Sequence, residues 1–286
     1  MRWENGRRSD NIEDRRGMRV SGRGLAGGGI GAIVLALVAM YFGVDPSVVL
    51  NQAGGLGGTP QESSQAAPSS PEETRLKDFM SVVLADTEDV WGTLFQGSGR
   101  QYEQPKLVLF SGAVQSACGF AEAAMGPFYC PGDHKLYLDM SFFNELANRH
   151  DAPGDFAQAY VVAHEVGHHV QTLLGISDKV NAARQRAGEA EGNAMQVRME
   201  LQADCFAGVW AYHANKARQI LEPGDTEEAL AAAAGVGDDR LQQQARGYVV
   251  PESFTHGSSE QRMRWFSRGM QSGDPGQCDT FKAAKL

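Results

Sequence analysis

The chain has 286 residues, of which 42% are hydrophobic and 21% charged, and this composition suits one globular domain with additional segments. Its formal net charge is -9, but residues 1–24 hold seven arginines against four acidic residues, so the tail is basic and the remaining chain strongly acidic. An acidic body is a poor partner for nucleic acid, because phosphates are bound by clustered Lys and Arg.

An uncharged run, LAGGGIGAIVLALVAMYFGV, occupies residues 25–44. Because about 20 apolar residues are enough for a helix to cross a bilayer, we predict a transmembrane helix here. The arginines precede this run, which places residues 1–24 in the cytoplasm as a basic tail and the rest of the chain in the periplasm or outside the cell. A cleaved signal peptide has a shorter apolar core, of about 7–15 residues. A buried helix of a soluble protein is the other alternative, which the length and the flanking charge disfavour.

Residues 45–72 are rich in Gly, Ser, Pro, Gln and Ala, as in a flexible linker. The folded domain is therefore expected at residues 73–286. Apolar residues recur at helical spacing between Leu76 and Phe95. A strand is expected in residues 106–112 and a hairpin in residues 126–140. Further helices are expected over residues 141–148, 155–175, 189–216 and 226–235. This order predicts an α+β fold, mostly helical with a small β-sheet.

The stretch AHEVGHHVQ contains the pattern H-E-x-x-H, which is typical of zinc-dependent hydrolases. Residues four apart on a helix face the same way, so His164 and His168 can bind one Zn²⁺ ion. Hydrolytic zinc sites use three protein ligands and keep the fourth position for water. Glu165 lies one step round the helix, too far for a ligand, and is expected to act as the catalytic base toward that water.

A third ligand is offered by the stretch RMELQADCFAG, where Glu200 and Asp204 lie four apart among apolar residues. Carboxylates buried in an apolar helix are costly unless a cation compensates them. We therefore assign Glu200 as the third zinc ligand. Asp204 is expected to accept the free ring N–H of a ligand histidine, most readily His164. A solvated helix face, or one paired with Arg198, is the alternative interpretation.

The stretch SFTHGSSEQR contains His256, just before a helix that begins with a capping box. A histidine there could donate a hydrogen bond to the oxyanion of a tetrahedral intermediate, and a role as a turn or cap residue is equally open. Arg262 and Tyr248 are weaker candidates for the same task. His169 points about 140° away from His164 and is expected to pack against the protein or face solvent.

The four cysteines all follow the predicted membrane helix, in a compartment expected to be oxidising. Three pairings are possible. We favour a disulfide between Cys118 and Cys130, which closes a short loop beside the hairpin. That choice leaves Cys205 to pair with Cys278, which would tie the Glu200 helix to the C-terminal tail.

Taken together, these motifs resemble the gluzincin group of zinc peptidases, in which H-E-x-x-H is completed by E-x-x-x-D on a later helix. More narrowly, the chain resembles the bacterial neutral zinc metallopeptidase family, whose members are anchored in the membrane through one N-terminal helix. The resemblance implies a zincin-like fold, with His164, His168 and Glu200 as ligands and Glu165 as the base. The matching stretches are GVDPS, LADTEDVW, GPFYCPGDHKLYLD, VVAHEVGHHVQ, ELQADCFAGVWA and SFTHGSSEQRMRWFSRG.

The sequence therefore predicts a membrane-anchored zinc endopeptidase that acts on peptides or proteins. An extended substrate would pair with an exposed strand edge, for which GPFYC and KLYLD are the candidates. The alternative is a non-catalytic envelope adaptor stabilised by zinc. A structural zinc would be closed by four protein ligands, and the sequence offers three convincing ones, which favours catalysis.

Overall fold

The structure is a computed structural model, and it describes residues 1–18 and 70–286. The predicted transmembrane helix, residues 25–44, and nearly all of the predicted linker lie outside the described residues. Among the residues that are described, no helix is long and apolar enough to span a membrane. Residues Met1–Arg16 and Ser69–Leu286 form one compact unit, which contains every element discussed below.

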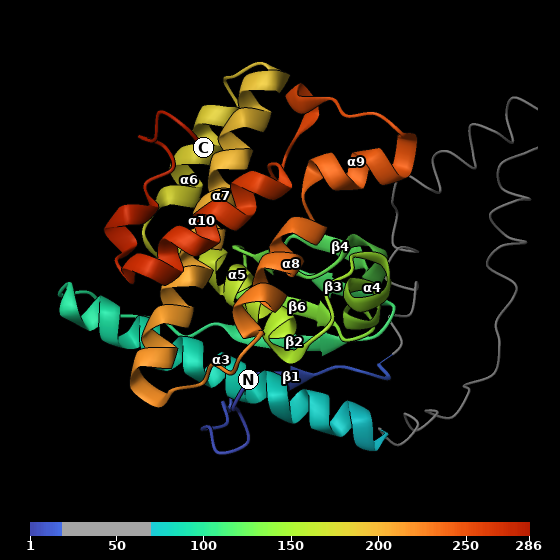
Figure 1. Ribbon diagram of the computed structural model, residues 1–286, viewed down its shortest axis with the longest axis vertical. Helices are drawn as coiled ribbons and strands as arrows, with labels where there is room; N and C mark the ends of the chain where they lie inside the picture. The colour runs from blue at the N-terminus through green and yellow to red at the C-terminus, as the bar shows by residue number, and fades with distance from the viewer. Residues whose placement is uncertain (19–69) are drawn as a thin grey trace, which may run out of the picture. The chain divides into compact units, whose positions relative to one another are not determined.

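The unit has the predicted α+β class, with helices packed around small sheets (Figure 1). The helices are α3 (Pro71–Gly97), α4 (Phe142–Arg149), α5 (Asp155–Leu173), α6 (Ile176–Arg184), α7 (Glu189–Arg218), α8 (Asp225–Gly235), α9 (Asp238–Arg246) and α10 (Ser259–Ser272). Short 3₁₀ turns are η2 (Ala123–Met125), η3 (Pro251–Ser253) and η4 (Pro275–Cys278). Every helix expected within residues 73–286 is present, and α6 and α9 were not predicted.

A four-stranded sheet has the order β1-β2-β6-β5. Its strands are β1 (Ile12–Asp14), β2 (Lys106–Phe110), β6 (Lys135–Asp139) and β5 (Phe128–Cys130). The first three run parallel, whereas β5 and β6 form the predicted antiparallel hairpin. A separate hairpin joins β3 (Ala113–Ser116) to β4 (Gly119–Glu122). Strand β6 is paired on both sides, whereas β5 stands at the end of the strand order and is therefore an edge of the sheet.

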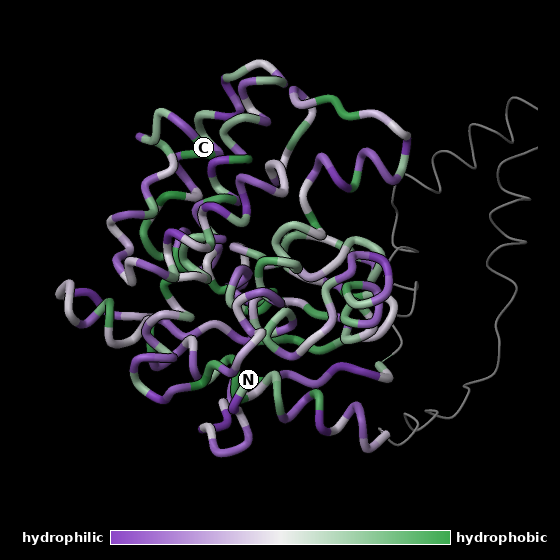
Figure 2. Tube along the Cα trace, in the orientation of Figure 1, coloured by the Kyte–Doolittle hydropathy of each residue, from purple (hydrophilic) through white to green (hydrophobic). Residues whose placement is uncertain are grey.

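Both faces of the sheet are covered, which explains why β2 is an almost continuous apolar run. Leu107 and Leu109 pack into the main core formed with the helices. Val108 and Phe110 face the opposite way, into a smaller cluster with the β3–β4 hairpin. Alternate residues of a strand point to opposite faces, so a strand buried on both sides must be apolar throughout. By contrast, α9 is mostly hydrophilic (Figure 2), and within it only Asp238 is buried.

The N-terminal residues differ from their prediction. Residues 1–24 were expected to form a separate basic tail, but Met1–Arg16 belongs to the same unit as the domain. Trp3 is buried against Phe79, with the ring centroids 5.2 Å apart. Arg7 pairs with Glu88 at 2.8 Å, and Arg8 pairs with Asp78 at 2.6 Å. Arg7 and Arg8 therefore neutralise acidic side chains of α3, and Met1–Arg16 packs with the domain instead of forming a separate tail.

The helices that carry the functional motifs cross at very short distances. Gly167 of α5 lies against the backbone of Ala203 on α7. Gly269 of α10 lies so close to Cys205 of α7 that a Cβ atom would overlap its carbonyl oxygen. Both favoured disulfides are present, Cys118–Cys130 beside β5 and Cys205–Cys278 between α7 and η4. The close contacts with α5 and α10 and the disulfide to η4 together hold α7 in place.

Candidate metal centre

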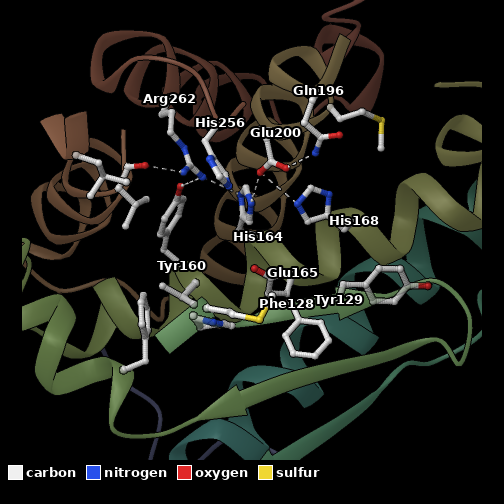
Figure 3. Close-up of a pocket in the computed structure, with 18 of the residues that line it drawn as sticks. Phe128, Tyr129, Tyr160, His164, Glu165, His168, Gln196, Glu200, His256 and Arg262 are labelled. Atoms are coloured by element: carbon white, nitrogen blue, oxygen red, sulfur yellow. Dashed lines mark hydrogen bonds and ion pairs between the residues drawn. The ribbon is translucent and has the colours of Figure 1, made fainter. Parts of the chain in front are cut away.

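His164 and His168 project from α5 toward Glu200 on α7 (Figure 3). The Nε2 atoms of His164 and His168 lie 3.2 and 3.4 Å from Oε2 of Glu200. In a tetrahedral zinc site with bonds of about 2.0–2.1 Å, two ligand atoms are separated by about 3.3–3.4 Å. Two imidazole nitrogens and a carboxylate oxygen at this spacing therefore fit a zinc ion.

Burial and the neighbouring charges together set the pKa values of these groups. Burial opposes protonation of His164, but Asp204 and Glu200 outweigh that effect and raise its pKa to about 9. Burial opposes protonation of His168 as well, and Glu200 raises its pKa. The same two histidines outweigh the effect of burial on Glu200 and lower its pKa. The carboxylate thus attracts positive charge to this point, which is the charge that a metal dication supplies.

Asp204 supports His164 from behind, as the sequence predicted. Nδ1 of His164 donates to Oδ1 of Asp204 at 2.8 Å. A carboxylate can only accept here, so the Nδ1 atom carries the proton and Nε2 is left for a metal. Tyr160 donates its hydroxyl to the same oxygen. Arg262 binds both carboxylate oxygens of Asp204, through Nε and Nη2, each at 2.9 Å.

Arg262, a weaker candidate for the oxyanion role, has its guanidinium group engaged with Asp204. Its side chain lines the cavity beside His164, but it is buried and links α10 to Asp204 on α7. Burial raises the pKa of Asp204, but Arg262 and His164 outweigh it and lower that pKa to about 2. The hydrogen bond from Nδ1 of His164 to the carboxylate of Asp204 keeps His164 in one orientation. Arg262 also balances the negative charge of the buried Asp204.

Two glutamines that the sequence analysis did not identify hold the other two groups. Nδ1 of His168 donates to Oε1 of Gln171 at 2.9 Å, and Gln171 in turn donates to the carbonyl of Met199. Gln196 donates to Oε1 of Glu200 at 2.7 Å. Both contacts had a signal in the sequence, because Gln171 follows His168 by three positions and Gln196 precedes Glu200 by four. Residues at these spacings are neighbours on a helix surface.

A cavity of about 540 Å³ opens at this centre. Glu165 lines it from α5, on the side of β5, and lies beside Phe128 in Figure 3. The edge strand β5 contributes Phe128 and Tyr129 to the same wall. The cavity thus brings together the three ligand candidates, the candidate base and the free edge of the sheet.

His256 also lines the cavity, and it is held by a residue that the sequence analysis missed. Nδ1 of His256 donates to Oδ1 of Asp238 at 3.2 Å. The hydrogen bond to Asp238 raises the pKa of His256. Tyr248 is 58% exposed and does not line the cavity. His169 is buried behind the centre between Tyr129 and the carbonyl of Glu103, so it packs as expected.

Comparison with known proteins agrees with this geometry. The family model described as "Putative neutral zinc metallopeptidase" matches residues 1–281. The chain belongs to this family. The matched region includes the docked segment Met1–Arg16 as well as every residue of the candidate centre.

Two relatives are similar to this chain over most of its length. "Uncharacterized protein YpfJ" of Escherichia coli K12 is 51% identical over 290 residues, covering 98% of this chain and 99% of the relative. "Uncharacterized protein Rv2575" of Mycobacterium tuberculosis H37Rv is 45% identical over 268 residues, covering 87% of this chain and 86% of the relative. No solved structure matches the chain.

Proposed function

We propose that the chain is a zinc-dependent endopeptidase with a zincin-like catalytic domain. The observation that carries this proposal is the spacing of three ligand atoms, His164 Nε2, His168 Nε2 and Glu200 Oε2, at the wall of an open cavity. Among the described residues, the group that could hold a metal ion here has these three members. Three ligands leave one position for water, as in catalytic zinc sites, whereas a structural zinc of an adaptor would be closed by four.

The roles of the side chains follow from their positions. When bound, zinc lowers the pKa of a coordinated water to about 7 and polarises a carbonyl group. Glu165, on the β5 side of the cavity, accepts the proton of the attacking water and returns it to the leaving amine. His256 donates from its free Nε2 to the oxyanion that forms at the scissile carbonyl. Asp204 and Gln171 keep the two histidines in the required tautomers.

The substrate class follows from the wall of the cavity. The edge strand β5 lies along it, while β6 is already paired on both sides. An extended peptide can therefore add to the edge of β5, pairing with its free backbone groups. Of the two strands considered from the sequence, the topology favours the one in GPFYC.

Replacement of Glu165 by Gln tests this function. The variant keeps the size of the side chain and removes the proton acceptor, so peptide cleavage should fall by about 10²–10⁴-fold while zinc binding is retained. Metal analysis and cleavage of a peptide library, with and without chelator, measure both properties. Glu145→Gln makes the same chemical change elsewhere on the cavity wall and should leave cleavage close to that of the parent. Parental cleavage by Glu165→Gln would show that Glu165 is not the base.

A further inference from the structure

The two oxygens of Glu200 have different partners. Oε2 faces the Nε2 atoms of His164 and His168, at 3.2 and 3.4 Å. Oε1 points away from them and accepts a hydrogen bond from Nε2 of Gln196 at 2.7 Å, drawn as a dashed line in Figure 3. Gln196 and Glu200 lie one turn apart on α7, so the helix itself sets this contact. One carboxylate oxygen is thus occupied while the other remains available.

The orientation of the Gln196 amide is fixed from its other end. Nη1 of Arg184 on α6 donates to Oε1 of Gln196 at 2.6 Å. A guanidinium group can only donate, so the amide oxygen must face Arg184 and the amide NH₂ group must face Glu200. The positive charge of Arg184 also polarises the amide and strengthens its hydrogen bond to Glu200.

We propose that Gln196 is a positioning residue that restricts Glu200 to binding metal through one oxygen, Oε2. This inference deepens the proposed function and rests on its metal site. A carboxylate that bound through both oxygens would occupy a further coordination position, which the catalytic water needs. Because Gln196 is neutral, it holds Oε1 without cancelling the negative charge of Glu200. An arginine in direct contact with Glu200 would compete with the metal for that charge.

Gln196 also lines the cavity, so a direct contact with substrate is the rival explanation for any loss of activity. Arg184 separates the two explanations. It bonds to Gln196 but is not among the residues that line the cavity. A loss of zinc affinity in Arg184→Met that the loss of an exposed cation from α6 does not reproduce must therefore pass through Gln196.

The test compares Gln196→Met, Arg184→Met and the double variant with the parent. Zinc affinity is measured by competition with a chromophoric chelator, and coordination number by the visible spectrum of the Co²⁺-loaded protein. We expect Gln196→Met to raise the zinc Kd by at least about tenfold, the usual effect of losing a residue that supports a ligand. Its Co²⁺ spectrum should shift toward a higher coordination number. Arg184→Met should raise the Kd by a smaller factor, and the double variant should match Gln196→Met alone.

Lys179→Met is the matched control, because it removes an exposed cation from the same helix α6. Its zinc affinity should equal that of the parent. A zinc Kd and a Co²⁺ spectrum that are unchanged in Gln196→Met would overturn the proposal, and a raised KM alone would make Gln196 a substrate contact. If Gln196→Met does not fold, Arg184→Met carries the test by the same measurements.

The same measurements keep this inference distinct from the proposed function. A parent protein that binds zinc, loses affinity as described in the variants and cleaves no peptide would contradict the peptidase function and support the role of Gln196. A parent protein that binds no zinc would overturn both.

Discussion

The side chain of Asp238 is used almost entirely to shape the loop that carries His256. Its Oδ2 accepts backbone N–H groups of Thr255, His256 and Gly257, at 2.7, 2.6 and 3.0 Å. Its Oδ1 accepts from Nδ1 of His256. These contacts leave the other ring nitrogen of His256 as the one that can serve the cavity. The pair also fixes a charge state, since the carboxylate favours the protonated imidazole.

Asp238→Asn should change the pH dependence of cleavage. The hydrogen bond to Asp238 raises the pKa of His256, so the variant should lower that pKa toward its ordinary value. If protonated His256 donates to the oxyanion, activity is present below this pKa and lost above it. The alkaline limb of a kcat/KM profile should therefore move to lower pH in Asp238→Asn.

Asp239→Asn provides the control for this prediction. Asp239 accepts from the backbone and hydroxyl of Ser259 and has no contact with His256, so its change should leave the alkaline limb in place. An alkaline limb that is the same in Asp238→Asn and the parent would remove His256 from the reaction. An equal shift in both variants would point to a general effect on the loop.

Among the site residues, the sequence predicted those whose positions depend on spacing within a single helix. The spacing in H-E-x-x-H and E-x-x-x-D places side chains on one face of a helix wherever that helix lies. Asp238 and Arg262 were different, because each acts on a residue from another element. Nothing in the local pattern indicated that Arg262 would bind both carboxylate oxygens of Asp204. Gln171 and Gln196 were missed because neutral amides have no typical ligand motif.

The arrangement of the helices depends on glycines at their crossings. On α7, Gly208 faces the backbone of Phe266 on α10, and on α10, Gly269 faces Cys205. The two helices therefore approach one another with backbone against backbone. This approach brings Arg262 of α10 within hydrogen-bonding distance of Asp204 on α7. The candidate metal centre is thus connected, through Arg262 and Asp204, to a helix crossing that a single added methyl group would disturb.

Gly269→Ala should lower the free energy of unfolding and weaken zinc binding together. The new Cβ atom would overlap backbone atoms of α7, which cannot move aside as a flexible side chain can. Overpacking of this kind costs about 1–3 kcal/mol, and occasionally more. Urea denaturation and chelator competition measure the two effects.

Gly92→Ala is the control at the level of the helix. Gly92 lies within α3, and a Cβ atom there meets nothing within 4 Å. Alanine should stabilise the helix by about 0.5–1 kcal/mol, since glycine is the poorer helix former. If Gly269→Ala were as stable as Gly92→Ala, the crossing would be looser than the structure indicates.

Sequence patterns missed elements that bury little apolar surface, and they misplaced some element ends by one or two residues. In α9 only Asp238 is buried, so no apolar stripe marked it as a helix. Helix α5 starts at Asp155, where the sequence predicted it, with Gly154 at the cap position. Helix α3 begins at Pro71, after a capping box of Ser70 and Glu73, two residues before the predicted start of the domain.

For the whole molecule, the docked N-terminal segment changes the interpretation of the charges. The arginines before an apolar run were read as a sign of cytoplasmic location. In the structure, however, the segment Met1–Arg16 is part of the domain, and β1 pairs with β2 along Ile12, Glu13 and Asp14. Lys135 of β6 pairs with Glu13 at 2.8 Å. A sequence read in order cannot show that residues 1–16 have their partners near residue 80 and beyond.

The two disulfides bear on where this unit resides. Cys118–Cys130 and Cys205–Cys278 together pair all four cysteines of the chain. Disulfides persist in oxidising compartments and are rare in the cytoplasm. They support the proposal that the domain acts outside the cytoplasm. Because Met1–Arg16 is packed on the domain, we propose the same location for that segment.

This proposal predicts the accessibility of two exposed positions. One crossing of a membrane between residues 18 and 70 would put Asp10 and Gln271 on opposite faces, where the segment and the domain could not pack. Asp10→Cys and Gln271→Cys each add one thiol at an exposed site of a chain whose own cysteines are paired. In intact cells with a permeable outer layer, a membrane-impermeant maleimide should label both variants to the same extent as after lysis. The parent should remain unlabelled in both conditions. Labelling of Gln271→Cys in intact cells, with Asp10→Cys labelled only after lysis, would mean that the N-terminal segment does not dock on its own domain in the cell.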